Sequence, residues 1–140
     1  MFKYITILIL YIYLILCTIS DIRTKKINLK LSLAFLLLGF FIYPFFIKSD
    51  IKILLYNLLP GICILLVSLF TKGAIGAGDA VILIIMSFYM PSASILIILF
   101  FSLLMASVIA VTLIIKKYSR KYALPFAPFI TLGYTIFLLI

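Results

Sequence analysis

The chain has 140 residues, of which 68% are hydrophobic and only 11% are charged. A soluble domain averages about 45–50% apolar and about 25% charged residues, so this composition excludes a water-soluble globule. The formal net charge is +9, but the basic residues interrupt apolar runs, which argues against a nucleic-acid partner and for an anionic lipid surface. We expect a single membrane-embedded domain over residues 1–140, an all-α bundle of about six transmembrane helices.

Apolar runs and their breaks predict the crossings, which are residues 4–20, 31–47, 51–70, 79–90, 93–115 and 123–140. The first run lacks a small-residue cleavage site, so it is interpreted as a retained helix and not as a signal peptide. The fourth run has only twelve residues, about 18 Å of helix against a hydrocarbon core of about 30 Å. It must begin upstream near Gly73, cross a thinned membrane or be sheltered by neighbouring helices. Because the connections are short, consecutive helices are expected to pack as antiparallel neighbours.

Lys and Arg are unequally distributed between the predicted connections. The odd-numbered connections carry nine of the twelve basic residues, and the opposite side carries Lys3, Lys48 and Lys52. Positive charge in short loops is retained on the cytoplasmic side. The sequence therefore predicts a multi-pass protein of the plasma membrane, with the odd-numbered connections in the cytoplasm and both termini outside.

The chain has three acidic residues, Asp21, Asp50 and Asp79, and no histidine. The predicted topology places Asp21 and Asp79, 58 residues apart in sequence, at the same cytoplasmic boundary. Two neighbouring carboxyl groups share a proton, so the ionised one can draw a proton from water while the protonated one polarises a carbonyl. This is the chemistry of an aspartic peptidase. Asp50 lies between Lys48 and Lys52 and is interpreted as a solvated loop charge.

The predicted helix ends suggest different roles for the two acids. Asp79 precedes an apolar run and is expected at a helix N-terminus, where the helix dipole favours the anion, whereas Asp21 is expected near a C-terminus. This would make Asp79 the base and Asp21 the initial proton holder. Cys17 and Cys63 lie far apart inside apolar runs and are interpreted as small buried hydrophobes. No metal site and no cofactor are expected, because histidine, glutamate and paired cysteines are all lacking.

Three of the six glycines fall between residues 73 and 78, directly before Asp79. Glycine lets a backbone segment or a ligand approach closely, so Gly76 and Gly78 are candidates for the docking of an extended segment beside Asp79. The same small residues would also let membrane helices approach one another. The sequence leaves both interpretations open.

Three blocks of sequence resemble the type IV prepilin peptidases, which are polytopic membrane aspartic peptidases of the GxGD kind. The segment 21–27 resembles the family's first catalytic segment, and Gly-Ala-Gly-Asp at 76–79 matches the block that holds its second catalytic Asp. Leu-Pro-Phe-Ala-Pro-Phe at 124–129 resembles the closing Pro-Phe-Gly-Pro segment. The resemblance implies that Asp21 and Asp79 are catalytic. It adds Pro125 and Pro128 to the two glycines as substrate-binding or loop-shaping positions.

The resemblance also implies a substrate, a prepilin-like or pseudopilin precursor whose short basic leader is removed at the cytoplasmic membrane face. Longer members carry an N-terminal cysteine motif and a methyltransferase activity; nothing here matches that segment, so a minimal, peptidase-only form is expected. The sequence departs from the usual pattern at a few positions. Ala127 replaces a Gly, Asn28 and Leu29 replace Pro and Asn, and Val81 stands where many members have Lys.

Two other interpretations remain. Facing acids in a small membrane bundle can bind cations or relay protons, as in a transporter or channel subunit. Such acids usually lie near the middle of the membrane, whereas Asp21 and Asp79 are predicted at its boundary. The chain could also be an inactive relative that only binds during pilus assembly, an interpretation that the changed positions Asn28 and Leu29 keep open.

Overall fold

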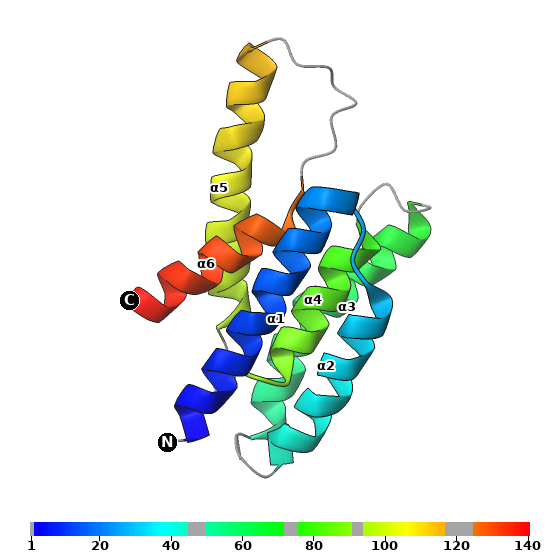
Figure 1. Cartoon of the computed structure of the whole chain (residues 1–140), viewed down its shortest axis with the longest axis vertical. Coiled ribbons are helices and arrows are strands. Elements are labelled where there is room, and N and C mark those ends of the chain that lie inside the picture. The colour runs from blue at the N-terminus through cyan, green and yellow to red at the C-terminus, as the bar shows by residue number, and fades with distance from the viewer. Residues whose placement is uncertain (1, 45–49, 72–75, 91–93, 117–124) are drawn as a thin grey trace.

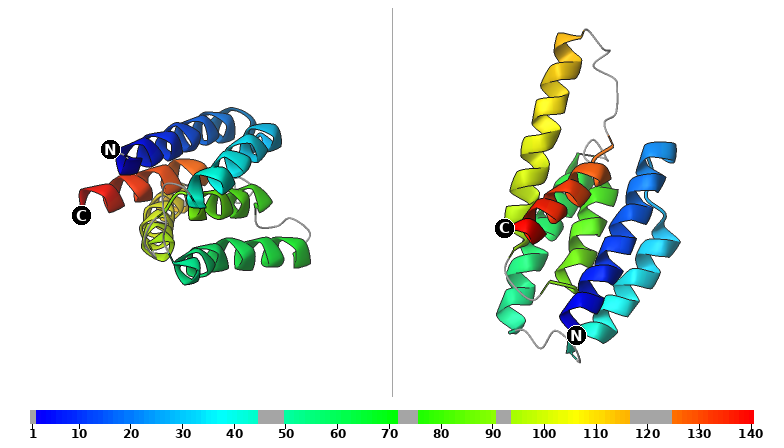
Figure 2. Two further views of the ribbon diagram at one scale, coloured as in Figure 1. Left: turned by 90° about the horizontal axis from the view of Figure 1, so that it is seen from below. Right: turned by 60° about the vertical axis from the view of Figure 1, so that its left-hand side comes forward.

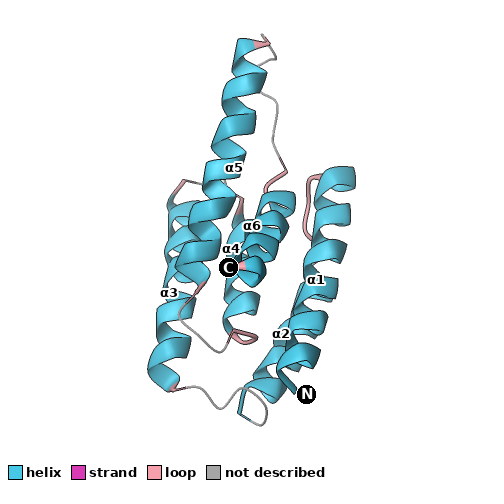
Figure 3. Ribbon diagram, turned by 90° about the vertical axis from the view of Figure 1, so that its left-hand side faces the viewer, coloured by secondary structure: helices cyan, strands magenta, loops and turns pink. Residues whose placement is uncertain are grey.

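The computed structural model describes residues 2–44, 50–71, 76–90, 94–116 and 125–140. Within these ranges the chain forms six α-helices and no strand (Figure 3). In chain order they are α1 (Phe2–Thr24), α2 (Leu29–Ile42), α3 (Ile51–Phe70), α4 (Ala77–Ser87), α5 (Ile95–Ile115) and α6 (Ala127–Leu139). The predicted all-α bundle is therefore confirmed. Parts of the predicted crossings and connections, at 45–49, 72–75, 91–93 and 117–124, lie outside the described residues.

Three of the helices are long and apolar enough to cross a membrane. The candidate spans in α1, α3 and α5 have 21, 20 and 21 residues, with mean hydropathies of 2.3, 2.3 and 2.8. Their outer faces carry large apolar side chains, such as Phe70 and Ile115, which are 85% and 74% exposed. Continuous apolar surface of this extent is stable in lipid and not in water. The chain is thus a membrane protein.

Helix α4 occupies the inside of the bundle. It has 11 residues, about 16 Å of helix, which is too short to cross a hydrocarbon core of about 30 Å. Figure 2 shows it between α3 on one side and α1 and α2 on the other. Six of its residues are buried: Ala80, Ile82, Leu83, Ile85, Met86 and Ser87. Of the three alternatives for the short fourth crossing, the structure therefore supports shelter by neighbouring helices.

The packing partners follow chain order for only part of the bundle. Helices α3 and α4 pack against each other, as do α5 and α6, but α1 packs mainly against α6. Two hydroxyl pairs join α1 to α6: Thr18 and Thr131, whose Oγ1 atoms are 2.8 Å apart, and the Tyr11 hydroxyl with Thr135 Oγ1 at 3.1 Å. The expectation that consecutive helices are neighbours is thus confirmed for α3–α4 and α5–α6 and, through smaller contacts, for α4–α5. Tyr13 of α1 also contacts Ser32 and Phe35 of α2, but the main partner of α1 is α6.

The helices alternate in direction, so α1 and α3 end, and α2, α4 and α6 begin, toward the same end of the bundle (Figure 1). We call this the acid end of the bundle, because both Asp21 and Asp79 lie there. Asp21 is inside α1, which continues to Thr24; the predicted end of the first crossing at residue 20 was therefore too early, and Asp21 is not a loop residue. Helix α5 extends beyond the other helices at this end (Figure 1), and none of its residues 103–115 is buried.

Candidate active site

Asp79 is held by residues next to it in sequence. It lies in the first turn of α4, as predicted, and Gly76 is the N-cap of that helix. The backbone N–H of Asp79 donates to the Gly76 carbonyl oxygen at 3.1 Å. The Asp79 carboxyl group turns back over Gly76, so that a Cβ atom on Gly76 would lie 2.7 Å from Asp79 Oδ2. Only a residue without a side chain leaves the carboxyl group in this position.

Gly78 makes room for a different segment of the chain. A Cβ atom on Gly78 would lie 2.6 Å from Cδ1, 3.0 Å from Cγ1 and 3.2 Å from Cβ of Ile27. Ile27 belongs to the connection of residues 25–28, between α1 and α2. The close approach at each of these two glycines is therefore made by a side chain of this chain, Asp79 at one and Ile27 at the other.

Asp21 is held from the far end of the sequence. It is only 8% exposed, and its Oδ2 accepts a hydrogen bond of 3.0 Å from the backbone N–H of Ala127, which is 106 positions later. Ala127 is the first residue of α6, and Pro128 follows it in the first helical turn. Proline suits that turn, because its missing N–H would have no acceptor within the helix. Pro125 directly precedes the N-cap residue, Phe126, so the closing block begins the helix that contacts Asp21.

The acid end brings two acids together and leaves the third elsewhere. The carboxyl groups of Asp21 and Asp79 are close enough to interact electrostatically. Asp50 is the exposed N-cap residue of α3, and its side chain makes no capping hydrogen bond. The start of α3 lies at the opposite end of the bundle (Figure 1).

The structure does not support the assignment of Asp79 as the base and Asp21 as the initial proton holder. That assignment relied on Asp79 lying at a helix N-terminus and Asp21 at a helix C-terminus. Asp21 does lie in the last turns of α1, but its carboxylate also accepts from the first N–H of α6. The carboxyl groups of both acids are therefore beside a helix N-terminus, which stabilises a negative charge. Sequence position alone does not distinguish base from acid.

The connection after α1 is a turn fixed by hydrogen bonds. The Ser20 hydroxyl group donates to the Lys26 carbonyl oxygen at 2.8 Å. The Thr24 hydroxyl group donates to the Ser20 carbonyl oxygen at 2.9 Å and accepts from the backbone N–H of Lys26 at 3.3 Å. Lys25 has a φ of 52°, a left-handed conformation often found at the end of a helix. Asn28 is the N-cap of α2, and its Oδ1 accepts from the backbone N–H of Lys30 at 3.1 Å. This cap was not among the predicted features, although an Asn directly before an apolar helical run is its usual signal.

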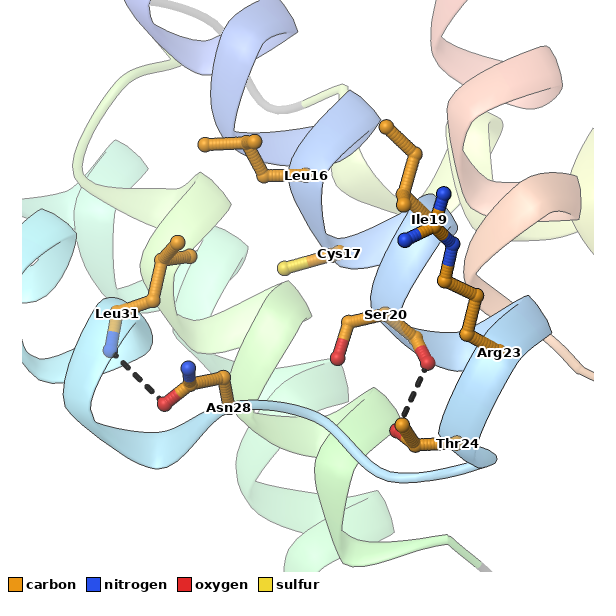
Figure 4. A pocket seen from close by; sticks show the side chains of 8 residues that line it. All are labelled: Leu16, Cys17, Ile19, Ser20, Arg23, Thr24, Asn28 and Leu31. Carbon is orange, nitrogen blue, oxygen red and sulfur yellow. Dashed lines mark hydrogen bonds between the residues drawn. The ribbon is translucent and has the colours of Figure 1, made fainter.

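A pocket of about 320 Å³ lies beside this connection. Figure 4 shows it between the last turns of α1 and the beginning of α2. Its lining is mostly apolar, with Arg23 as its charged member: Leu16, Cys17, Ile19, Ser20, Arg23, Thr24, Asn28 and Leu31. Cys17 is buried as predicted, whereas Cys63 is exposed on α3, so the expectation of a buried Cys63 was wrong. Among the described residues, no three His, Cys, Asp or Glu side chains are grouped to hold a metal ion.

Comparison with known families identifies the chain at the level of a family. A family model described as the type IV leader peptidase family matches residues 8–111, well over half of the chain. This chain belongs to that family, and a peptidase activity is what the family implies. The matched segment includes Asp21, Gly76, Gly78 and Asp79, and it ends before Pro125 and Pro128. No curated protein and no solved structure matches the chain.

Proposed function

We propose that this chain is an aspartic endopeptidase that removes the short basic leader from type IV prepilin-like or pseudopilin precursors. One observation carries the proposal: two of the three acidic residues, 58 positions apart in sequence, interact at one end of the bundle, and one of them is buried. An ionisable side chain in a membrane bundle is costly and marks a functional site by default. Membership of the leader peptidase family supports this class of substrate.

The two carboxyl groups suit a general acid–base mechanism with water as the nucleophile. The ionised carboxyl group accepts a proton from water while the water oxygen bonds to the scissile carbonyl carbon. The protonated carboxyl group gives its proton to the carbonyl oxygen, which forms a tetrahedral diol. The first carboxyl group then passes its proton to the amide nitrogen, the C–N bond breaks, and the second regains its proton from the diol. Because Asp21 Oδ2 accepts from Ala127, Oδ1 is the oxygen of Asp21 that exchanges protons.

The charge distribution supports a site for this chemistry at the cytoplasmic face of the plasma membrane. The acid end is where the odd-numbered connections begin and end, and these carry nine of the twelve basic residues, a bias that marks the cytoplasmic side. The leader of the substrate would meet the acid pair there, while its apolar helix stays in the bilayer. The cationic connections would contact anionic lipid, since they do not attract a basic leader.

The decisive experiment is cleavage in membranes of cells that co-express the protein with a small panel of prepilin-like precursors. We expect wild type to shorten at least one precursor, and Asp21→Asn and Asp79→Asn each to abolish the shortening. Asp50→Asn is the matched control, since it removes the same charge at the opposite end of the bundle and should cleave like wild type. All four proteins are compared at equal membrane levels.

Three outcomes would contradict the proposal. Cleavage that persists in Asp21→Asn or Asp79→Asn would exclude the two-acid mechanism. Failure of stably inserted wild type to cleave any precursor, with a precursor still retained on the protein, would favour an inactive assembly relative. The same failure, with an ion flux that requires Asp21 and Asp79, would favour a transporter or channel subunit.

A further inference from the structure

The contact between Ile27 and Gly78 joins the two segments that carry the acids. Ile27 comes six residues after Asp21, in the connection that ends α1, and Gly78 directly precedes Asp79. The Ile27 side chain is partly buried and packs against the core. Its Cβ, Cγ1 and Cδ1 atoms all lie within 3.2 Å of the position that a Cβ on Gly78 would take. The two segments therefore touch with no space for one additional methyl group.

Ile27 is presented on a segment that is fixed at both ends. On one side, the Ser20 hydroxyl group donates to the Lys26 carbonyl oxygen, and the Lys26 N–H donates to Thr24 Oγ1. On the other side, Asn28 caps α2. The contact also includes the stiff part of the side chain, since Cγ1 and Cβ take part as well as the terminal Cδ1. A β-branched residue has few χ1 rotamers available. Ile27 can therefore transmit the position of the connection to the first turn of α4.

We propose that Ile27 is a positioning residue for the acid pair. Its contact with Gly78 sets the distance between the last turns of α1 and the first turn of α4. This inference rests on the proposed function, because it assigns to the contact a role in the chemistry of Asp21 and Asp79. A methyl group added at residue 78 would push α4 away from the connection and separate the carboxyl groups. Removing atoms from Ile27 would remove the contact that holds the first turn of α4 at its distance from the connection.

The test compares Ile27→Ala, Gly78→Ala and the double variant in the purified full chain, with the precursor that wild type cleaves in the membrane assay. We expect Gly78→Ala to lower kcat by about 30-fold, since a displacement of about 1 Å can cost about 100-fold. The double variant should recover at least about 5-fold of that loss, because the added methyl group then has room. Leu29→Ala is the matched control: it removes the same kind of apolar side chain two positions later, at the first residue of α2, where the side chain is 70% exposed.

The pH profile separates positioning from mere loss of folded protein. Two coupled carboxyl groups share one proton over a wide pH range, and the range contracts when they move apart. We expect the bell-shaped profile of kcat to be narrower in Gly78→Ala than in wild type and to widen again in the double variant. A smaller amount of folded enzyme would lower the profile without changing its width. An unchanged width, or losses that simply add in the double variant, would overturn the proposal.

Two controls keep the result decisive. If Gly78→Ala does not insert, Ile27→Val decides the question. Removing Cδ1 should lower kcat by about 3-fold and the thermal midpoint by at most a few degrees, and an unchanged kcat would overturn the proposal. The Asp21→Asn and Asp79→Asn variants distinguish the two levels of inference. If they are inactive while the Ile27 and Gly78 variants behave like wild type, the positioning role fails and the proposed function stands. If they are active, the proposed function itself fails.

Discussion

The two acids at the same end of the bundle are held in opposite ways. Asp79 is placed by the turn in which it lies: its N–H contacts Gly76, three residues earlier, and its carboxyl group fits over that same glycine. Asp21 is placed by Ala127, which is 106 positions later. One half of the candidate site is thus a local module, and the other half exists only when the first and last helices have packed together.

The largest expected effect on the cleavage rate comes from disturbing the local module, in which Gly76 makes room for the Asp79 carboxyl group. Gly76→Ala places a methyl group where the Asp79 carboxyl group lies, so the carboxyl group must turn away. We expect the cleavage rate to fall by about 100-fold, the cost of a displacement of about 1 Å in a catalytic group. The thermal midpoint should change little, because residue 76 is exposed. Rates and midpoints are measured on the purified protein in detergent.

The neighbouring Ala77 offers the matched control for that variant. Ala77→Gly also changes the side chain of an exposed residue at the start of α4, but it adds no atom near the carboxyl group. Its cleavage rate should stay within about 2-fold of wild type. Glycine within a helix lowers the stability of the folded protein by about 0.5–1 kcal/mol relative to alanine. Equal rates for Gly76→Ala and wild type would show that Asp79 does not need its present position.

Removing the hydrogen bond between Ala127 and Asp21 should lower the cleavage rate by a smaller factor. Replacing the amide between Phe126 and Ala127 by an ester, with lactic acid incorporated at 127, removes the N–H that Asp21 accepts from. A hydrogen bond to a charged group contributes about 1.5–3 kcal/mol, so we expect cleavage to fall by at least about 10-fold. Ala127→Gly keeps the N–H and restores the usual family residue, and it should retain most of the activity. An ester variant as fast as wild type would show that α6 does not assist Asp21.

A smaller effect is expected at Asn28, whose side chain caps a helix. Asn28 caps α2 through its side-chain oxygen, and replacing such a cap by Ala costs about 1 kcal/mol. Asn28→Ala should therefore lower the midpoint of thermal unfolding by a few degrees, whereas Asn28→Ser should lower it less. A loss of cleavage much greater than the loss of stability would show that Asn28 also shapes the acid site.

The smallest effect is expected at Asp50. Its side chain makes no capping hydrogen bond and is exposed, so Asp50→Ala should change the free energy of unfolding by less than about 0.5 kcal/mol. Thermal unfolding and cleavage should both match wild type. A marked loss of either would mean that the third acid has a partner that its place at the start of α3 does not indicate.

Much of the candidate site could be read from residues that lie close together in sequence. The glycines before Asp79 and the apolar run after it predicted a helix N-terminus with an acid in its first turn, and the structure places Asp79 there. Local signals of this kind suffice because the contacts at Gly76 span only three residues. The Asn28 cap belongs to the same class, because its signal is an Asn directly before an apolar helical run.

Other features could not be read in this way. The resemblance pointed to Pro125 and Pro128, but nothing in the sequence indicated that the helix they begin would donate a hydrogen bond to Asp21. The contact of Ile27 with Gly78 was equally hidden, since any apolar residue in a connection could face lipid. The exposure of Cys63 shows the same limit: an apolar run does not show which of its faces meets another helix.

The sequence by itself determined that this protein is a bundle of apolar helices in a membrane, where each helix begins and ends to within a few residues, and which acids fall at the same end. Hydropathy, chain breaks and the alternation of short connections are sufficient for that. Only the tertiary structure decided that α4 lies inside, that α1 packs against α6, and that Asp21 meets the first amide of α6. These depend on which side chains interlock, and in lipid, where every helix face is apolar, the hydrophobic pattern does not specify the partner.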